Sequence, residues 1–301
     1  MDDSAVDALN ARFGIAEHVS FKAGPGGLPV AAISNARASG IVSVLGGQVT
    51  AFQPHGHEPV LWVSECSHYE VGSAIRGGIP VCWPWFGPHP KDSSKPSHGF
   101  VRTRMWSVLG ADVIGNEATQ VRLGIADASD TRALWPHRFE LEICVAIGKE
   151  LRVDLVVRNP GSEEWTCTGA LHTYLNVGDV TKIAIHGLDG CCYDEDSAEP
   201  RLQRGAVTIA SEVDRIYFDT TSPCTIEDPR LARRIRIAKA GSHSTVVWNP
   251  WVGKARRLQD FGDEEYLDMV CVETANSRHD PVTLPPGGEH RLSAVISVER
   301  V

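Results

Sequence analysis

Residues 131–162 read TRALWPHRFELEICVAIGKELRVDLVVRNPGS, and they indicate the fold class of the whole chain. Residues 139–148 (FELEICVAIG) and 150–159 (ELRVDLVVRN) form short runs in which apolar and polar side chains often alternate. This alternation is typical of strands with one buried face. A tight turn at Gly148–Glu150 separates the two runs, so the stretch predicts an antiparallel hairpin within a β-meander.

Runs of the same kind recur from about residue 28 to the C-terminus, separated by turn residues. No convincing helix lies between them, which argues against a parallel α/β sheet. Residues 4–12 alone resemble a short amphipathic helix. Because there is no internal repeat or low-complexity linker, we predict one all-β domain over residues 1–301. It would be a large antiparallel sandwich or barrel with a short N-terminal helical segment. The predicted strands include LPVAAISN, GIVSVLGG, PVLWVSE, TRMWSVLGADVI, TQVRLGIA, KIAIHGL, STVVWN and MVCVETA.

The composition excludes several classes of protein. Hydrophobic residues make up 42% of the 301 residues and charged residues 22%, which argues against wholesale disorder. A net charge of -9 disfavours nucleic acid as a partner, and a small anionic ligand would need a local group of arginines. No run of 18 apolar residues predicts a membrane helix, and the N-terminus lacks an apolar signal core.

The cysteines indicate a reducing compartment. None of the eight falls in a C-x-x-C pair, and a disulfide framework would be expected only in a secreted context. We therefore interpret them as reduced thiols of a cytoplasmic protein, several of them core residues. They are Cys66, Cys82, Cys144, Cys167, Cys191, Cys192, Cys224 and Cys271.

Two ionisable residues interrupt apolar strand-like runs. His172 lies in TGALHTYLNVGD and Glu273 in MVCVETAN. A carboxylate in such a run is costly to bury in its charged form, so Glu273 either pairs with a cation or faces a cleft. For His172 taken alone, the structural interpretation is a hydrogen-bonded core histidine.

Two further groups of candidate residues come before the middle of the chain. SHGFVRTRMW contains His98, and alternation predicts Arg102 and Arg104 on one face of a strand, where they could also form a solvated basic edge. QPHGHEP contains an H-x-H pair next to Glu58. That spacing lacks a fixed third ligand for a metal site, and its proline and glycine neighbours favour an exposed turn.

Seven segments occur in an order that resembles one family: RGGIPVCWPWFG, HGFVR, ALHTYLNVGD, DRIY, VVWNPW, MVCVETA and LPPGGEHRLSAVISV. From about residue 30 to the C-terminus the chain is similar to the glucose-6-phosphate 1-epimerases, also called hexose-6-phosphate mutarotases. These belong to the aldose 1-epimerase, or galactose mutarotase-like, superfamily. The resemblance implies a large antiparallel β-sandwich and a cofactor-independent epimerase acting on a hexose 6-phosphate.

The resemblance also implies roles for single residues. His172 matches the general acid and Glu273 the general base. His98 matches a histidine that orients the sugar ring, and Asp214 a carboxylate that binds sugar hydroxyls or supports the histidines. The matched phosphate ligands are Arg76 and Arg102.

The loop at residues 76–90, RGGIPVCWPWFGPHP, then has an interpretation of its own. Its prolines and glycines exclude a helix and a central strand, so it would be a rigid loop. Trp83 and Trp85 would pack against the apolar face of a sugar, beside the planar charged fork of Arg76. The alternative is that the two indoles only pack as an aromatic plug.

The residue types also fit the reaction on chemical grounds. A hemiacetal ring opens when a base takes the O1 proton while an acid protonates the ring oxygen, and this requires neither a metal nor a cofactor. Two other functions stay open, namely a mutarotase for unphosphorylated aldoses and a non-catalytic carbohydrate-binding sandwich. We expect a monomer, with a dimer as the alternative.

Overall fold

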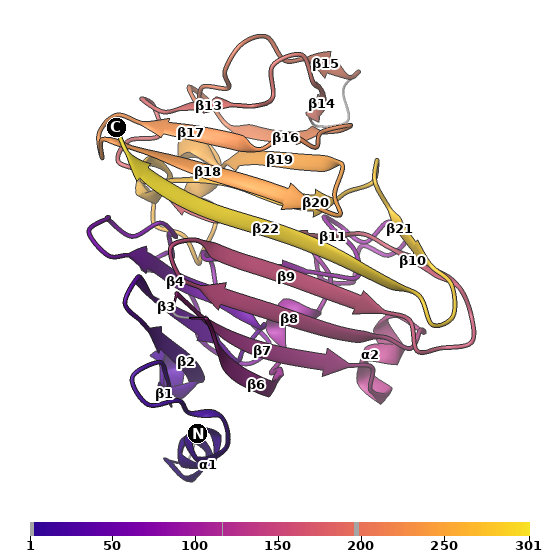
Figure 1. Ribbon diagram of the computed structural model, residues 1–301. Helices are drawn as coiled ribbons and strands as arrows, with labels where there is room; N and C mark the ends of the chain where they lie inside the picture. The colour runs from indigo at the N-terminus through magenta and orange to yellow at the C-terminus, as the bar shows by residue number, and fades with distance from the viewer. Residues whose placement is uncertain (1–2, 116, 196–198) are drawn as a thin grey trace.

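The computed structural model describes residues 3–115, 117–195 and 199–301, and two large antiparallel sheets make up most of it (Figure 1). In the first, which we call the meander sheet, the strand order is β13-β17-β18-β22-β9-β8-β7-β6. In that order the bounds are Ala184–His186, Cys224–Asp228, Arg233–Ala240, Glu289–Arg300, Leu151–Arg158, Glu140–Ile147, Ala118–Ala126 and Ser107–Ile114. The predicted hairpin is β8 and β9, in register with Ile147 opposite Leu151. The all-β prediction is confirmed.

The second sheet, which we call the site sheet, has the order β15-β14-β16-β19-β20-β11-β5, and β12 also pairs with β20. The bounds are Arg201–Leu202, Cys192–Glu195, Val213–Tyr217, Ser244–Asn249, Met269–Asn276, Gly169–Leu171 and Val81–Cys82, with β12 at Tyr174–Asn176. Behind the long strand β22, the site sheet packs against the meander sheet through β11 and β20 (Figure 1).

Smaller elements complete the architecture. A four-stranded N-terminal sheet packs against β7 and β8, next to the helix predicted near the N-terminus. Its strands are β1 (Val19–Ala23), β2 (Pro29–Ser34), β3 (Ala38–Ser43) and β4 (Gln48–Pro54), and β10 (Trp165–Cys167) pairs with β21 (Val282–Leu284). The helices are α1 (Asp3–Phe13), α2 (Ser129–Leu134) and α3 (Trp251–Ala255), with short 3-10 turns η1 (Pro25–Gly27), η2 (Val101–Thr103) and η3 (Glu265–Leu267). Within the described residues, no helix combines the length and apolarity that crossing a membrane requires.

Both faces of β20 are buried, and this positions the candidate site. Val270 and Val272 join the main core, which both large sheets share. Strand alternation turns Cys271 and Glu273 to the opposite face, and Cys271 packs there with residues of the loops beside α3, such as Phe261. The site sheet therefore has a second, covered face on which polar groups can be held away from water.

A buried arginine ties the meander sheet to distant loops. Arg233, at the start of β18, is 2% exposed and forms an ion pair with Asp228, with Nε 3.4 Å from Oδ2. Its guanidinium also donates to the carbonyl oxygens of Glu58, Pro59 and Asn176. One side chain thereby satisfies groups from three segments.

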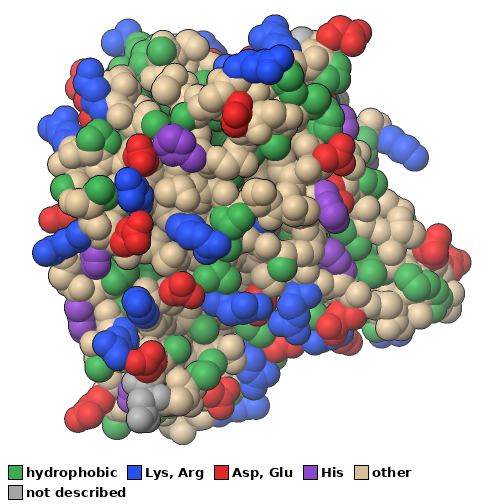
Figure 2. All heavy atoms as spheres, turned by 45° about the horizontal axis from the view of Figure 1, so that its top comes forward, with side chains coloured by type: hydrophobic (Ala, Val, Ile, Leu, Met, Phe, Trp, Pro, Cys, Tyr) green, Lys and Arg blue, Asp and Glu red, His purple; other side chains and the backbone are tan. Residues whose placement is uncertain are grey.

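The surface carries both signs of charge. On the face shown in Figure 2, basic and acidic side chains are interspersed.

Candidate active site

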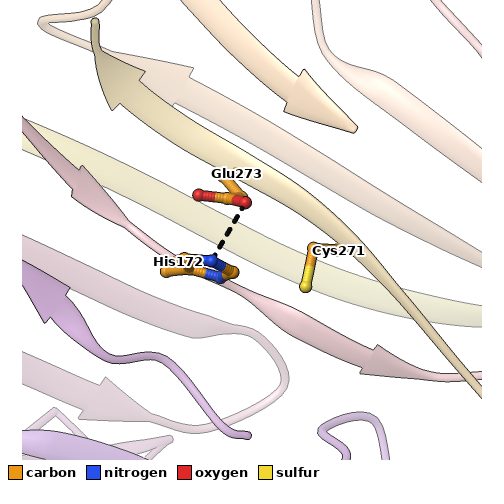
Figure 3. Close-up of side chains that lie close together, drawn as sticks. All are labelled: His172, Cys271 and Glu273. Carbon is orange, nitrogen blue, oxygen red and sulfur yellow. Dashed lines mark ion pairs between the residues drawn. The ribbon is translucent and has the colours of Figure 1, made fainter. Parts of the chain in front are cut away.

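The two candidate proton-transfer residues meet on the covered face of the site sheet (Figure 3). Glu273 lies on β20, and His172 lies between β11 and β12, which both pair with β20. His172 Nε2 is 3.4 Å from Glu273 Oε1, and both residues are buried. The strand pairing thus brings together two residues that are about 100 positions apart in the sequence.

Each residue of this pair keeps a polar atom unused. Among the described residues, His172 Nδ1 and Glu273 Oε2 are buried without a hydrogen-bond partner. Buried polar atoms are normally satisfied, so two unsatisfied atoms at one place indicate that a ligand supplies the missing groups. A sugar, with hydroxyl groups and a ring oxygen, has donors and acceptors for both.

The environment shifts the pKa values of this pair toward each other. Burial, with a contribution from the Asp214 carboxylate, holds the pKa of Glu273 well above its usual range. Burial holds the pKa of His172 well below its usual range, and the positive charges of nearby Arg102 and Arg76 contribute to this. A carboxyl group and an imidazole with converging proton affinities are suited to exchange protons with a bound ligand.

His98 is held as a neutral hydrogen-bond donor. Its backbone N–H donates to the carbonyl of Gly87 (2.7 Å), and the Gly87 N–H donates back to His98 Nδ1 (3.2 Å). Burial and the two arginines Arg102 and Arg76 lower the pKa of His98 to about 3, so the ring is neutral. Because Nδ1 accepts, Nε2 carries the proton. The ring lies 5.6 Å from that of His172, so it can present this N–H to the same ligand.

The sequence "HGF" fits this local geometry. His98 itself adopts a left-handed backbone conformation (φ 64°), and Gly99 follows at φ 71°. A Cβ at Gly99 would lie 1.8 Å from the carbonyl oxygen of Trp83, so only glycine fits there. The close approach of these two backbones fixes where His98 enters the site.

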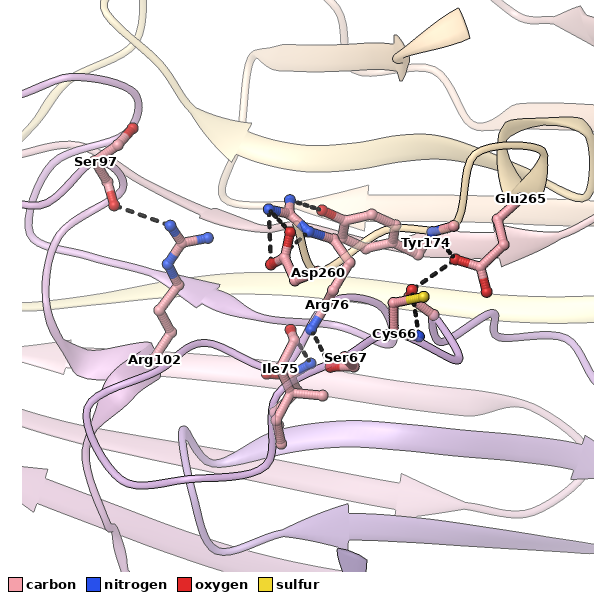
Figure 4. Close-up of polar contacts among 12 residues, drawn as sticks. Cys66, Ser67, Ile75, Arg76, Ser97, Arg102, Tyr174, Asp260 and Glu265 are labelled. Atoms are coloured by element: carbon pink, nitrogen blue, oxygen red, sulfur yellow. Dashed lines mark hydrogen bonds and ion pairs between the residues drawn. The ribbon is translucent and has the colours of Figure 1, made fainter. Parts of the chain in front are cut away.

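Arg76 is clamped from two sides (Figure 4). Its Nε and Nη2 donate to the two carboxylate oxygens of Asp260, each at 3.1 Å, and Nη1 donates to the hydroxyl of Tyr174 at 3.1 Å. Tyr174 in turn stacks on His172, with ring centroids 4.7 Å apart. The predicted phosphate ligand is therefore also part of the support of His172, and a bound phosphate would share it with Asp260.

Arg102 makes fewer hydrogen bonds than Arg76, and its position corrects the prediction of a strand at this point of the chain. Residues 101–103 form the 3-10 turn η2 rather than a strand, so Arg102 and Arg104 do not share a strand face. Arg104 turns away to an ion pair with Asp130. Arg102 donates through Nη2 to the carbonyl of Ser97 (3.0 Å), while its buried Nε has no partner among the described residues. That unused donor is suited to an anion.

The two loop tryptophans, for which a contact with sugar is predicted, are both buried. Trp83 is 1% and Trp85 is 4% exposed. Trp83 packs among core aromatic rings such as Phe139, and Trp85 donates its indole N–H to the carbonyl of Pro96. This packing agrees with the alternative interpretation, in which the two indoles form an aromatic plug. Their large apolar rings bury more area in the core than they would on a solvent-facing loop.

Two other aromatic residues lie beside the histidines: Trp248, which sequence reasoning did not single out, and Phe86 of the loop at residues 76–90. Trp248 lies 6.2 Å from the ring of His172 and Phe86 lies 5.0 Å from that of His98. The register places Trp248 between Asp214 and Cys271 on the site face. The only feature of the sequence that could have pointed to Trp248 as a site residue is its place in the VVWNPW segment, because alternation alone does not say which face of a strand binds a ligand.

Asp214 lies on β16 at the edge of the same face. Its Oδ2 is 3.3 Å from Nζ of Lys254, which also pairs with Glu212. The carboxylate is half-exposed and contributes to the raised pKa of Glu273, so it stands near the pair without being buried with it.

The H-x-H segment lies in the turn after β4, as its composition indicates. His55 and Glu58 are exposed there, and His57 is partly exposed. Within the described part of the chain, the side chains close enough to share a metal ion are instead His172, Cys271 and Glu273.

A buried His–Glu pair on the covered face of an antiparallel sheet is suited to acid–base chemistry on a small polar molecule. Comparison with known proteins places the chain in a family. Residues 29–297 match the family described as aldose 1-epimerase, and the chain belongs to that family.

Similar proteins cover most of the chain. A Cenchrus ciliaris protein named "Putative glucose-6-phosphate 1-epimerase" is 36% identical over 289 residues, covering 91% of this chain and 87% of that protein. An Escherichia coli K12 protein of the same name is 35% identical over 232 residues, covering 76% of this chain and 77% of that protein. The crystal structure of a mutarotase-titled protein from Salmonella typhimurium superimposes with a TM-score of 0.89 at 27% identity, covering 99% of this chain and 100% of that chain.

Proposed function

We propose that this protein interconverts the α and β anomers of a hexose 6-phosphate, with glucose 6-phosphate as the first candidate. The observation that carries the proposal is the buried His172–Glu273 pair, with one unsatisfied atom on each residue, beside the unsatisfied Nε of Arg102. The names of the similar proteins support the same substrate. Neither the pair nor the arginine by itself would indicate both the reaction and the phosphate.

The proton balance of the reaction fits one proton shared by the pair. The shifted pKa values favour this proton on Glu273, so the reaction requires that it move to His172 first. The Glu273 carboxylate then takes the proton of O1, and the His172 imidazolium gives its proton to the ring oxygen. The C1–O5 bond breaks, the aldehyde rotates about C1–C2, and O5 attacks the other face of C1. The two proton transfers then run in reverse, so the pair ends with the protons it began with.

The phosphate has a further effect on this pair. The charges of Arg102 and Arg76 help to hold the pKa of His172 down. A bound phosphate dianion would offset those charges and so favour the imidazolium that donates to the ring oxygen. We propose that His98 Nε2–H orients the sugar and that the nearby rings of Trp248 and Phe86 pack against it, which their closeness to the two histidines supports.

We also propose that the chain works as one domain in the cytoplasm, as a monomer. One cluster of buried residues extends from Val19 to Ile296 and takes in both large sheets, which supports a single folding unit. All eight cysteines are free, which supports a reducing compartment.

Anomer exchange measured by NMR tests the proposal directly. Magnetisation transfer between the α and β signals of glucose 6-phosphate should be accelerated by the protein, and that of glucose much less. Equal acceleration for both sugars would instead favour a mutarotase for unphosphorylated aldoses. Binding of the sugar phosphate without accelerated exchange would favour a carbohydrate-binding sandwich.

The role of Arg102 is tested by its removal. Arg102→Ala is expected to weaken binding of glucose 6-phosphate by about 1.5–3 kcal/mol, the scale of hydrogen bonds to charged groups. Titration calorimetry with glucose 6-phosphate and glucose measures the difference. Arg104→Ala is the matched control, because Arg104 is two residues away and pairs with Asp130. A loss of the same size in the control, or for glucose, would contradict a phosphate contact by Arg102.

A further inference from the structure

A thiol completes a set of three potential metal ligands at the candidate site (Figure 3). Cys271 and Glu273 are two residues apart on β20, so their side chains share a face, and His172 lies opposite. One ligand atom from each of the three lies within 4.8 Å of the others, and all three side chains are buried. The proton-transfer chemistry makes no use of Cys271.

The three donor types match a particular class of cation. Imidazole nitrogen, thiolate sulfur and carboxylate oxygen are the ligands of Zn²⁺, and a thiolate disfavours Mg²⁺ and Ca²⁺. Metal–ligand bonds of about 2.0–2.3 Å hold tetrahedral ligands roughly 3.3–3.8 Å apart, so ligand atoms that lie within 4.8 Å of one another need to approach by about 1.5 Å at most. His172 Nδ1 and Glu273 Oε2 have no hydrogen-bond partner among the described residues, so the pair has lone pairs that a cation could use.

We propose that His172, Cys271 and Glu273 form an inhibitory site for one thiophilic divalent cation, such as Zn²⁺ or Cd²⁺. The inference of inhibition rests on the proposed function, whereas the binding site does not. A cation held there takes the lone pair of His172 and the carboxylate of Glu273, so neither group can move a proton of the sugar. It also occupies the space beside the atoms that the ligand would satisfy, so the cation and the sugar phosphate compete.

A second buried cysteine on the same face provides a comparison for Cys271. Cys82 is equally buried and shares the site face through its partner Ala170, yet it does not belong to the group of three. It is therefore a matched control.

Cadmium binding provides a readout that is independent of activity. The chelator-treated protein is titrated with CdCl₂, while thiolate-to-metal charge-transfer absorption and calorimetry report the bound ligand type and the stoichiometry. The parent and Cys82→Ala should bind one tight Cd²⁺ per chain with a thiolate signature. Cys271→Ala should bind at least 10-fold more weakly and lose that signature, and Cys271→Ser provides a second variant should the alanine fail to fold.

Zinc inhibition is then measured by NMR anomer exchange, relative to the metal-free rate of each variant. Zn²⁺ should inhibit the parent competitively with glucose 6-phosphate, Mg²⁺ should not, and Cys271→Ala should be at least 10-fold less sensitive. Unchanged cadmium binding in Cys271→Ala would overturn the site. Activity that is lost on chelation and restored by zinc would overturn its inhibitory role. If the metal-free protein exchanges no anomers while cadmium binds as expected, the proposed function fails and the metal site stands.

Discussion

Glu273→Gln is expected to lower the turnover of anomer exchange by about 10² or more, the low end for loss of a positioned acid or base. Glutamine keeps the shape of the side chain but cannot accept the O1 proton as a carboxylate does. His172→Asn should cause a loss of similar size, because it removes the group 3.4 Å away that protonates the ring oxygen. Single-residue changes at the surface of the site, such as Lys254→Gln, should cost far less.

The same substitution at Glu273 should stabilise the fold, and this separates loss of chemistry from loss of structure. Burial raises the pKa of Glu273 above that of the unfolded chain, so ionising this group destabilises the folded state as the pH rises. At neutral pH the glutamine variant should therefore melt at a higher temperature than the parent. The gain should vanish below the ordinary glutamate pKa, where the carboxyl is protonated in both states.

Two outcomes would contradict this account of the pair. If either variant exchanges anomers at the parent rate, that residue is not a proton-transfer group. If Glu273→Gln melts at a lower temperature at neutral pH, its carboxylate stabilises the fold, and a catalytic loss could then reflect local unfolding. NMR exchange and thermal melts at neutral and acidic pH measure both quantities.

Arg233→Ala is expected to destabilise the protein by about 3–5 kcal/mol, the usual cost of breaking a buried ion pair from one side. The change leaves Asp228 buried without its cation and removes the donor to the carbonyl oxygens of Glu58, Pro59 and Asn176. Urea unfolding measures the difference in the free energy of unfolding.

The neighbouring residue supplies the control for this prediction. Arg234 lies on the same strand, but its side chain is 42% exposed and its ion pair with Glu227 is solvent-exposed. Arg234→Ala should therefore cost about 0–1 kcal/mol. Similar losses in the two variants would mean that strand propensity or net charge, rather than the buried contacts of Arg233, accounts for the effect.

Sequence patterns predicted correctly those elements that form between residues close together in the chain. Alternation and the turn at Gly148–Glu150 predicted the hairpin of β8 and β9, and the N-terminal helix lies where it was predicted. The same rule failed at residues 101–104, where η2 replaces the predicted strand and the strand begins only at Ser107. Four residues hold too few alternating positions to separate a strand from a tight turn.

The sequence by itself determined the fold class and the family, because strand periodicity, turn residues and ordered motifs follow from the order of residues in the chain. It also identified His172 and Glu273 as candidate proton-transfer residues. Only the tertiary structure decided which face of β20 is covered by loops, that Trp83 and Trp85 pack inside, and that Cys271 stands beside the pair. It also decided that Arg76 binds Asp260, 184 residues away. The physical reason is that alternation identifies two faces of a strand, whereas what covers each face depends on contacts between segments that are remote in sequence.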